Sequence, residues 1–327
     1  MFAIPLAMPH STCLLPEGSF DTHVHVFDPN VGPYDGSRAY TPPDAPLKDL
    51  VDFSSKLNSS DSPLNLILVQ PSPYGTDNHV LLQSLRQLQK NPKIVVRGIA
   101  VVDVLQVTDV DLVQMHQVGV RGLRLNLQSA GKGVNLEQLK LTLLTASQKI
   151  QHLPGWRLQV FAPAAVWSEL YDFILQSPVE IIVDHIGGLL GASKIASGNA
   201  DPNVALSQAG FDSLVKLARG RRVWIKVSGL YRASLRTDSC YDDLEGIVRR
   251  LFHEVPERLI WASDWPHTGE GKARAGKDKA ARLAEIEEFR TIDNAKILQS
   301  LRNWSESEDT WKKIMVDNPR ELFASPR

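Results

Sequence analysis

The sequence predicts an α/β fold, a single (β/α)8 TIM barrel in which eight parallel strands alternate with helices. Eight short apolar segments recur along the 327 residues, and a helical pattern separates each from the next. In the stretch 77–90, for example, Leu81, Leu85 and Leu88 recur at helical spacing. A doubly wound open sheet would give a similar alternation. No Gly-rich phosphate loop follows any expected strand, which disfavours a nucleotide-binding sheet.

The elements follow in chain order. The expected strands are Phe20–Phe27, Asn65–Gln70, Ile94–Val101, Gly122–Leu127, Arg157–Phe161, Val179–His185, Val223–Val227 and Leu259–Ala262. The expected helices cover residues 46–57, 77–90, 109–117, 135–151, 165–176, 207–219, 241–252 and 280–290. No interior linker is long or low in complexity, so we expect an N-terminal arm, residues 1–18, and one domain over residues 19–327.

Composition narrows the class of protein. The chain is 43% hydrophobic with a net charge of −1, enough apolar residues for a large core and too even a charge for a nucleic-acid or membrane surface. The first sixteen residues are apolar, but Pro5 and Pro9 interrupt them and no basic segment precedes them, unlike a signal peptide. With only two cysteines, Cys13 and Cys240, a reducing cytoplasmic location is expected.

The first strand carries the most informative side chains. Polar and apolar residues alternate from Ser19 to Val26, which places Asp21, His23 and His25 on one face. Two imidazoles two residues apart converge on one point, as a metal ion or a polarised carbonyl requires. A matching carboxylate, Asp264, follows the eighth apolar segment.

The fourth strand alternates strictly, so Arg124 and Asn126 face the barrel axis while three leucines face the helices: Leu123, Leu125 and Leu127. An inward guanidinium needs an anionic partner, because an unpaired buried charge is very costly. That partner is either a structural carboxylate such as Asp103 or a carboxylate of the substrate.

Further candidates lie where strands end, the functional end of such barrels. His185 ends the sixth strand and shares parity with Ile181 and Val183, so it can face the axis. Arg232 lies just past the seventh strand. Three long loops, residues 28–46, 187–207 and 266–279, follow the first, sixth and eighth strands and suggest lids over a pocket.

Several motifs resemble the amidohydrolase superfamily, within it the branch of 2-pyrone-4,6-dicarboxylate lactonases and related sugar lactonases. The resemblance runs from about residue 19 to residue 323. The motifs are Asp21–Pro29, Val69–Asn78, Gly119–Arg124, Val183–His185, Lys226–Gly229, Ser263–Pro266 and Asp317–Pro319. It implies a distorted TIM barrel with one active site and a C-terminal helical elaboration at roughly 294–315.

The departures from metal-dependent members of this superfamily bear on the cofactor. Strand four offers Arg124 and Asn126 where those relatives have a lysine or an acid, and Phe161 stands near the position of a strand-five histidine ligand. The lactonase relatives work without metal. We therefore expect no required cofactor. The alternative is one Zn2+ or Mn2+ ion held by His23, His25, His185 and Asp264.

The resemblance implies hydrolysis of a carboxylated lactone of the pyrone carboxylate, muconolactone or aldonolactone type. Asp264 would be the general base, and His23, His25 and His185 would polarise the carbonyl. The expected substrate-binding residues are Arg124, Arg232, Ser72, Tyr74, Asn78 and Asn126. The partner is then a small anionic cyclic ester, with no nucleic acid and no membrane.

Three other functions stay open at this point. The same site could belong to a Zn2+- or Mn2+-dependent decarboxylase of an aromatic acid. It could also serve a lactone isomerase, which moves an acyl group or a proton without net hydrolysis. The non-enzymatic alternative is a degenerate barrel that only binds small acids.

Overall fold

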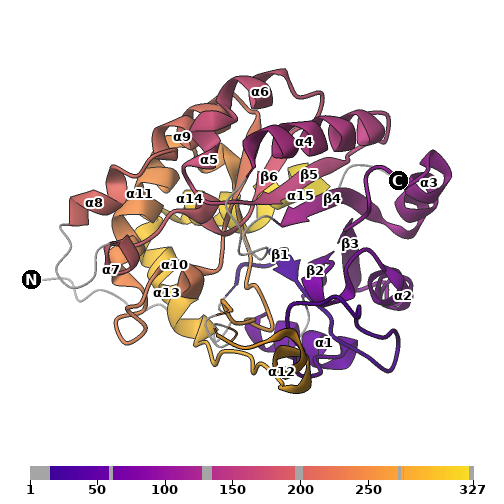
Figure 1. Ribbon diagram of the computed structural model, residues 1–327. Coiled ribbons are helices and arrows are strands. Elements are labelled where there is room, and N and C mark those ends of the chain that lie inside the picture. Colours follow the sequence, from indigo (N-terminus) through magenta and orange to yellow (C-terminus); the bar gives the residue numbers. More distant parts are fainter. Residues whose placement is uncertain are drawn as a thin grey trace, which may run out of the picture.

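The computed structural model describes residues 15–58, 62–126, 135–195, 202–271, 274 and 276–323. Eight parallel strands form one sheet in the order β1 to β8, with helices around it (Figure 1). The strands are β1 (Phe20–Val24), β2 (Leu64–Val69), β3 (Ile94–Ala100), β4 (Val120–Asn126), β5 (Arg157–Phe161), β6 (Ile181–Val183), β7 (Val223–Val227) and β8 (Leu259–Trp261). The predicted (β/α)8 barrel is confirmed, and β5 and β7 have the predicted bounds.

A helix or a pair of helices follows most strands. The helices are α1 (Leu47–Leu57), α2 (His79–Leu88), α3 (Asp109–Val118), α4 (Leu136–Ile150), α5 (Val166–Glu169), α6 (Tyr171–Gln176), α7 (Ala192–Ile195), α8 (Pro202–Leu206), α9 (Phe211–Arg219), α10 (Leu230–Ala233), α11 (Glu245–Glu254), α12 (Lys279–Ala284), α13 (Asn294–Trp304), α14 (Glu308–Lys312) and α15 (Asn318–Phe323). The single helix expected over 165–176 is divided at Leu170 into α5 and α6, and the one expected over 280–290 ends at Ala284.

The barrel closes between β1 and the segment that follows β8. The backbone N–H of His25 donates to the Trp265 carbonyl at 3.0 Å, and that of Asp264 donates to the His23 carbonyl at 3.1 Å. The Thr22 hydroxyl donates to the carbonyl of Trp261 at 2.7 Å. The two backbone bonds link the predicted histidines of the first strand directly to Asp264, the predicted general base, and to its neighbour Trp265.

Apolar side chains fill one end of the barrel interior. They come from six strands and form a cluster separate from the outer core between strands and helices: Phe20, Ile67, Val69, Ile99, Ile182, Trp224 and Ile260. Leu322 and Phe323 of α15 belong to the same cluster. The C-terminal helix thus closes one end of the barrel, and the polar inward side chains lie toward the other end.

A bulge in β1 corrects one expectation. Asp21 is paired with Leu66 and Val24 with Leu68, so three residues of β1 span two residues of β2. Both leucines belong to the outer core. Asp21 therefore shares a face with Val24 and not with His23, because one extra residue reverses the side-chain alternation. Its carboxylate accepts a hydrogen bond from the backbone N–H of Ser263 at 2.9 Å.

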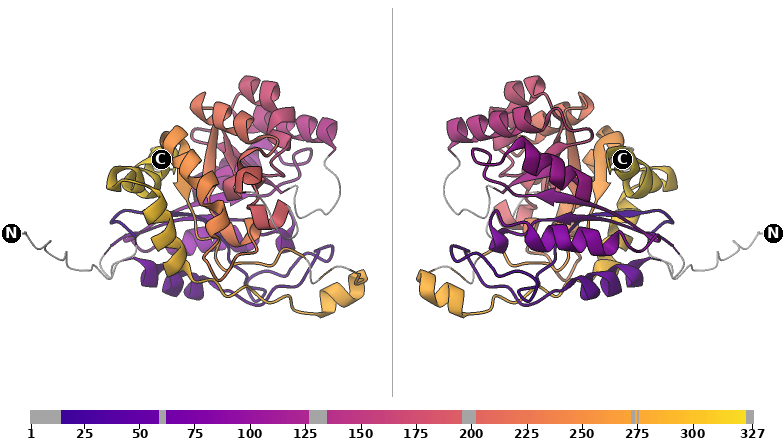
Figure 2. Two further views of the ribbon diagram at one scale, coloured as in Figure 1. Left: turned by 90° about the vertical axis from the view of Figure 1, so that its left-hand side faces the viewer. Right: turned by 90° about the vertical axis from the view of Figure 1, so that its right-hand side faces the viewer.

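The predicted long loop after β1 packs against the segment that follows the predicted loop after β8. The Thr41 hydroxyl, after β1, donates to the Leu283 carbonyl at 2.8 Å, and the Glu287 N–H donates to the Thr41 carbonyl at 2.8 Å. Figure 2 shows α12 projecting from the body of the barrel beside these loops.

Parts of the other predicted segments, residues 1–14, Leu127 and residues 196–201, lie outside the described residues. Among the helices of the described part of the chain, none is long and apolar enough to cross a membrane.

Candidate active site

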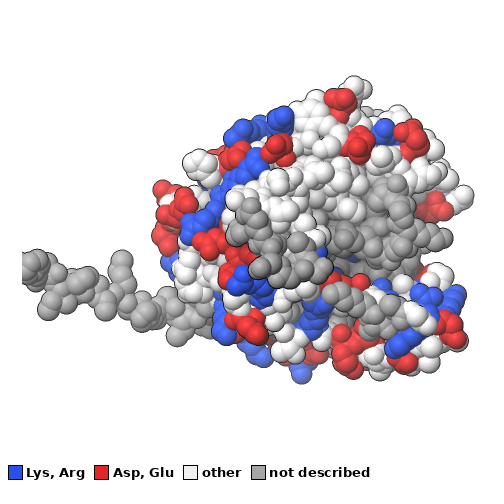
Figure 3. Space-filling view, turned by 60° about the vertical axis from the view of Figure 1, so that its left-hand side comes forward, with Lys and Arg blue, Asp and Glu red and all other residues white. Residues whose placement is uncertain are grey.

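A cavity of about 510 Å³ opens at the carboxyl ends of the strands. Its wall combines basic side chains with aromatic and aliphatic ones. The lining residues used below are His25, Arg124, Asn126, Phe161, His185 and Arg232. Acidic and basic side chains are interspersed on the face of the molecule shown in Figure 3. The cationic character of the cavity is therefore a local property of its wall.

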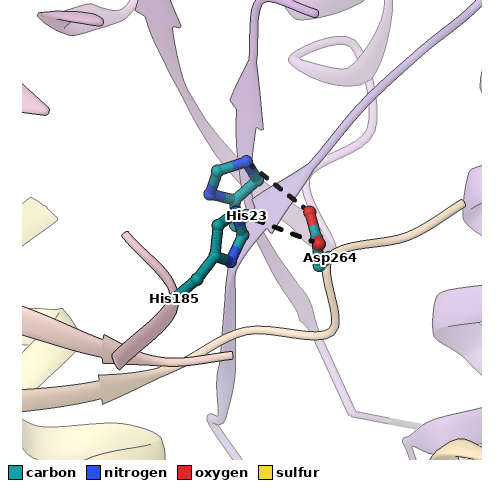
Figure 4. A group of neighbouring side chains, drawn as sticks. All are labelled: His23, His185 and Asp264. Atoms are coloured by element: carbon teal, nitrogen blue, oxygen red, sulfur yellow. Dashed lines mark ion pairs between the residues drawn. The ribbon is translucent and has the colours of Figure 1, made fainter. Parts of the chain in front are cut away.

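Three imidazoles and one carboxylate meet at the inner end of this cavity. His23 comes from β1, His185 follows β6 and Asp264 follows β8, and their side chains point toward one another (Figure 4). The Nε2 atoms of His23 and His25 are 3.2 Å apart, and each lies 3.8 Å from Asp264 Oδ1. His185 Nε2 lies 3.9 Å from Asp264 Oδ2. The structure brings together all four predicted catalytic side chains.

Left-handed backbone turns place two of them. β6 ends at Val183, and Ile181 and Val183 pack in the outer core, so the parity used to predict an inward His185 was wrong. His185 reaches the cavity because a 3₁₀ turn begins there with φ of 52°. Asp264 has φ of 64°, three residues past the end of β8. Non-glycine residues in this region are uncommon and cluster at functional sites.

The two oxygens of Asp264 have different surroundings. Oδ2 accepts hydrogen bonds from the Tyr231 hydroxyl and from Arg232 Nε, both at 2.7 Å. Oδ1 is buried and has no hydrogen-bond partner among the described residues. Burial alone would raise the pKa of Asp264, but Arg232 together with His185, His23 and His25 outweighs it, and the pKa lies well below its usual value. Asp264 is therefore an ionised acceptor with one free oxygen that faces the imidazoles.

The imidazoles are neutral near pH 7. Burial lowers the pKa of His25 to about 3 and that of His185 to about 4. For His23, burial and then the charge of Lys226 hold the pKa well below its usual value. A neutral imidazole donates through one nitrogen and accepts through the other, so each ring has a definite hydrogen-bonding direction.

Arg124 faces the axis as predicted, and its partner within the protein is a structural carboxylate other than Asp103. Its Nε lies 3.5 Å from Oδ2 of Asp184, a fully buried carboxylate after β6. Asp103 instead accepts from the backbone N–H of Leu105 at 2.9 Å within its own turn. The Nε of Arg124 satisfies no hydrogen-bond geometry within the described residues. The guanidinium thus keeps donor capacity at the cavity wall.

The sequence analysis did not predict a buried polar cluster that lies beside His23, on the side away from the cavity. Gln159 Nε2 donates to Asp184 Oδ2 at 3.0 Å, and Lys226 Nζ donates to Gln159 Oε1 at 2.8 Å. All three side chains are fully buried. A signal was available, because Lys226 and Gln159 are polar residues in the middle of otherwise apolar strands, and such residues are buried only with partners.

The remaining predicted binding residues divide into two groups. Ser72 and Asn126 line the cavity. Tyr74 and Asn78 are not among the described lining residues. Their side-chain polar atoms form hydrogen bonds with the backbone instead. The Tyr74 hydroxyl accepts from the N–H of Asp28 at 2.8 Å. The Asn78 side chain donates to the Val101 carbonyl at 2.7 Å and accepts from the Val101 N–H at 3.0 Å.

The positions of the donor atoms suit a metal ion. Ligand atoms of His23, His185 and Asp264 all lie within 4.8 Å of one another. The triangle formed by Asp264 Oδ1 and the Nε2 atoms of His23 and His25, with sides of 3.2, 3.8 and 3.8 Å, matches ligands around Zn2+ with bonds of ~2.0–2.2 Å.

The position of the hydrogen on His23 decides whether a metal ion fits. His25 Nδ1 lies 2.8 Å from the Val69 carbonyl, which only accepts, so Nδ1 carries the hydrogen and Nε2 is the acceptor. The contact of that Nε2 with His23 Nε2 is then a hydrogen bond only if His23 Nε2 carries a hydrogen. A protonated ring nitrogen has no lone pair for a cation. With the hydrogen on His23 Nε2 the residues do not fit a divalent ion, whereas with the hydrogen on His23 Nδ1 they do.

Comparisons with known proteins agree with the fold. The family model described as amidohydrolase matches residues 20–324. The chain is 28% identical over 319 residues to 4-sulfomuconolactone hydrolase of Rhizobium radiobacter, a match that covers 94% of the chain and 91% of that protein. It is also 28% identical over 318 residues to 2-pyrone-4,6-dicarboxylate hydrolase of Comamonas testosteroni, again covering 94% and 91%.

A solved structure extends this likeness to three dimensions. A candidate 2-pyrone-4,6-dicarboxylic acid hydrolase from Pseudomonas putida has a TM-score of 0.66 at 27% identity, covering 95% of the chain and 98% of that protein. Family match, barrel topology and the arrangement of the strand-end histidines and aspartate lead to one conclusion. The chain belongs to the amidohydrolase family.

Proposed function

We propose that this protein hydrolyses a small carboxylated lactone without a divalent metal. The observation that carries the proposal is the unpartnered Asp264 Oδ1, which faces the imidazoles at the inner end of a cavity walled by arginines. The relatives named as hydrolases of sulfomuconolactone and pyrone dicarboxylate support a lactone as the substrate class.

In the proposed reaction, Asp264 Oδ1 takes a proton from water while the water oxygen bonds to the lactone carbonyl carbon. General-base assistance of this kind contributes roughly 10²–10⁴-fold to the rate. His23 Nε2–H, shared between His25 Nε2 and the carbonyl oxygen, stabilises the negative charge that develops on that oxygen. The ring C–O bond then breaks, and Asp264 returns its proton to the leaving oxygen.

His185 has a matching place in this scheme. Its Nδ1 lies 3.0 Å from the Ser228 hydroxyl, which can donate to it and leave Nε2–H directed toward the site. Phe161 packs edge-on against the same ring, with centroids 4.7 Å apart, and limits its rotation. His185 would thus be a second donor to the oxyanion.

The cations of the wall select for an anionic substrate. Arg124 would bind a substrate carboxylate through its free donor capacity, and Ser72 and Asn126 lie along the same wall. Arg232 lines the cavity too, but two of its nitrogens are engaged, Nε with Asp264 and Nη2 with the Thr268 hydroxyl at 2.8 Å. We therefore assign Arg124 the larger share of carboxylate binding.

The test is a panel of pyrone, muconolactone and aldonolactone acids together with aromatic acids, assayed before and after exhaustive chelation. We expect acid release with a mass gain of one water for at least one lactone, and an unchanged rate after chelation. An unchanged product mass would indicate isomerisation, and loss of CO2 would indicate decarboxylation. Stoichiometric zinc whose removal abolishes activity and whose return restores it would refute the metal-independent reaction.

The Arg232→Met variant tests how Asp264 is kept ionised. Arg232 lowers the pKa of Asp264, so its loss should raise that pKa. In the unmodified protein Asp264 stays ionised well into acid, and activity should persist there. In the variant the acid limb of the kcat/KM profile should move to higher pH, because protonated Asp264 cannot accept a proton.

Arg274→Met is the matched control for this experiment. Arg274 lines the same cavity but pairs with Glu287, its Nε 2.7 Å from Oε2. Its loss should leave the acid limb in place. An acid limb that does not move in Arg232→Met would show that Arg232 does not control the ionisation of Asp264.

A further inference from the structure

Lys226 is a fully buried lysine that the proposed reaction does not use directly. It lies on β7 below the histidines, and it is not among the described residues that line the cavity. Its Nζ is 2.8 Å from Gln159 Oε1, 3.2 Å from His23 Nδ1 and 3.4 Å from Asp184 Oδ1. Lys226 therefore contacts the side of His23 that faces away from Asp264.

A chain of hydrogen bonds with a single direction ends at this lysine. His25 donates Nδ1–H to the Val69 carbonyl, so His25 Nε2 is a bare acceptor, and its 3.2 Å contact with His23 Nε2 is a hydrogen bond when His23 carries its hydrogen on Nε2. His23 is neutral, and with its hydrogen on Nε2 its Nδ1 is a bare acceptor. An ammonium group only donates, and Lys226 Nζ at 3.2 Å is a nearer donor to this Nδ1 than the Gln159 amide nitrogen at 3.5 Å.

A competing arrangement lies within reach of the same atoms. Asp184 Oδ1 is 3.3 Å from His23 Nδ1 and 3.4 Å from Lys226 Nζ, so it lies within reach of a hydrogen on either nitrogen. If His23 carried its hydrogen on Nδ1, it would donate to Asp184, and two bare Nε2 atoms would face each other beside Asp264 Oδ1. That is the carboxylate–histidine arrangement that orients a histidine toward a metal ion.

We propose that Lys226 is a positioning residue that holds His23 in the Nε2–H tautomer, and that this tautomer excludes a divalent cation from the site. Lys226 acts by donating to Nδ1 at the position where Asp184 would otherwise accept from it. The site thereby keeps an N–H donor where a metal-dependent site has a lone pair. The proposal rests on the metal-independent reaction proposed above.

The test is Lys226→Met, which removes the donor and keeps an unbranched apolar side chain in its place. His23 should then adopt the Nδ1–H tautomer, read from ¹⁵N-histidine NMR spectra. Zn2+ affinity, measured by titration calorimetry and metal analysis, should rise at least roughly tenfold, the lower end of the usual effect of residues that orient metal-ligating histidines. Neither readout requires turnover, so failure here is distinguishable from failure of the proposed function.

Two further variants make the result specific. Lys226→Arg keeps a cationic donor and should retain the Nε2–H tautomer and weak Zn2+ binding. Lys194→Met removes a positive charge from the cavity wall, where Lys194 pairs with Glu270 at 2.6 Å, and should not raise Zn2+ affinity. An equal gain in both methionine variants would mean that charge alone repels the cation.

The tautomer of His23 in the unmodified protein decides the proposal even if Lys226→Met fails to fold. A hydrogen on Nε2 supports it. A hydrogen on Nδ1 overturns it, as does an unchanged tautomer in a folded Lys226→Met variant.

Discussion

Asp264→Asn is expected to lower kcat at least about 10²-fold while the protein stays folded. An amide cannot accept a proton at neutral pH, and it nearly preserves the shape of the carboxylate. Its oxygen can still accept from Tyr231 and Arg232, which now bond to Asp264 Oδ2. Circular dichroism and a cooperative thermal transition would verify folding, and steady-state kinetics would measure the loss.

Asp21→Asn is the matched control. Asp21 is a second buried carboxylate close to the end of β8, but it faces the outer core and accepts from the Ser263 N–H. Burial raises its pKa to about 6, so the neutral form is already accessible near pH 7. The control should retain most of the activity. An Asp264→Asn variant with more than a tenth of the original kcat would remove Asp264 from the mechanism.

The sequence located the ends of the strands better than it oriented the side chains there. Short apolar segments predicted all eight strands, because burial on both faces leaves a strong compositional pattern. The prediction of side-chain direction was wrong at Asp21, where a bulge reverses the alternation. The reasoning was also wrong at His185, where a left-handed turn replaces the strand. Local backbone irregularities of this kind leave little trace in a period-two pattern.

The ion pairs between inward-facing side chains could not be predicted from the sequence either. Arg124 was correctly placed inside the barrel, but its partner Asp184 lies on a strand two positions away around the sheet. Arg232 was assigned to the substrate alone, whereas its Nε is bonded to the predicted base. Periodicity shows which side chains face inward. It does not show which of them meet across the axis, because that depends on the stagger of the strands.

These contacts give the two arginines different expected effects on catalysis. Removal of Arg232 changes the environment of the general base, so it should appear in the pH profile. Arg124 contacts neither Asp264 nor Tyr231 in the described interactions; its buried Nε faces Asp184, and the residue is part of the cavity wall. Its removal should therefore act mainly on the binding of the substrate.

Arg124→Met is expected to raise KM for a carboxylated lactone by roughly 10- to 150-fold with a much smaller change in kcat. A hydrogen bond to a charged group is worth about 1.5–3 kcal/mol, and each 1.4 kcal/mol is a factor of about ten. The comparison that decides the role uses the corresponding uncharged ester, for which KM should change much less. Arg121→Met is the control, since Arg121 is on the same strand but bonds outward to the His116 carbonyl at 2.9 Å. Equal penalties for acid and ester would show instead that Arg124 serves mainly to neutralise Asp184, because loss of that pairing would disturb the site whatever the charge of the substrate.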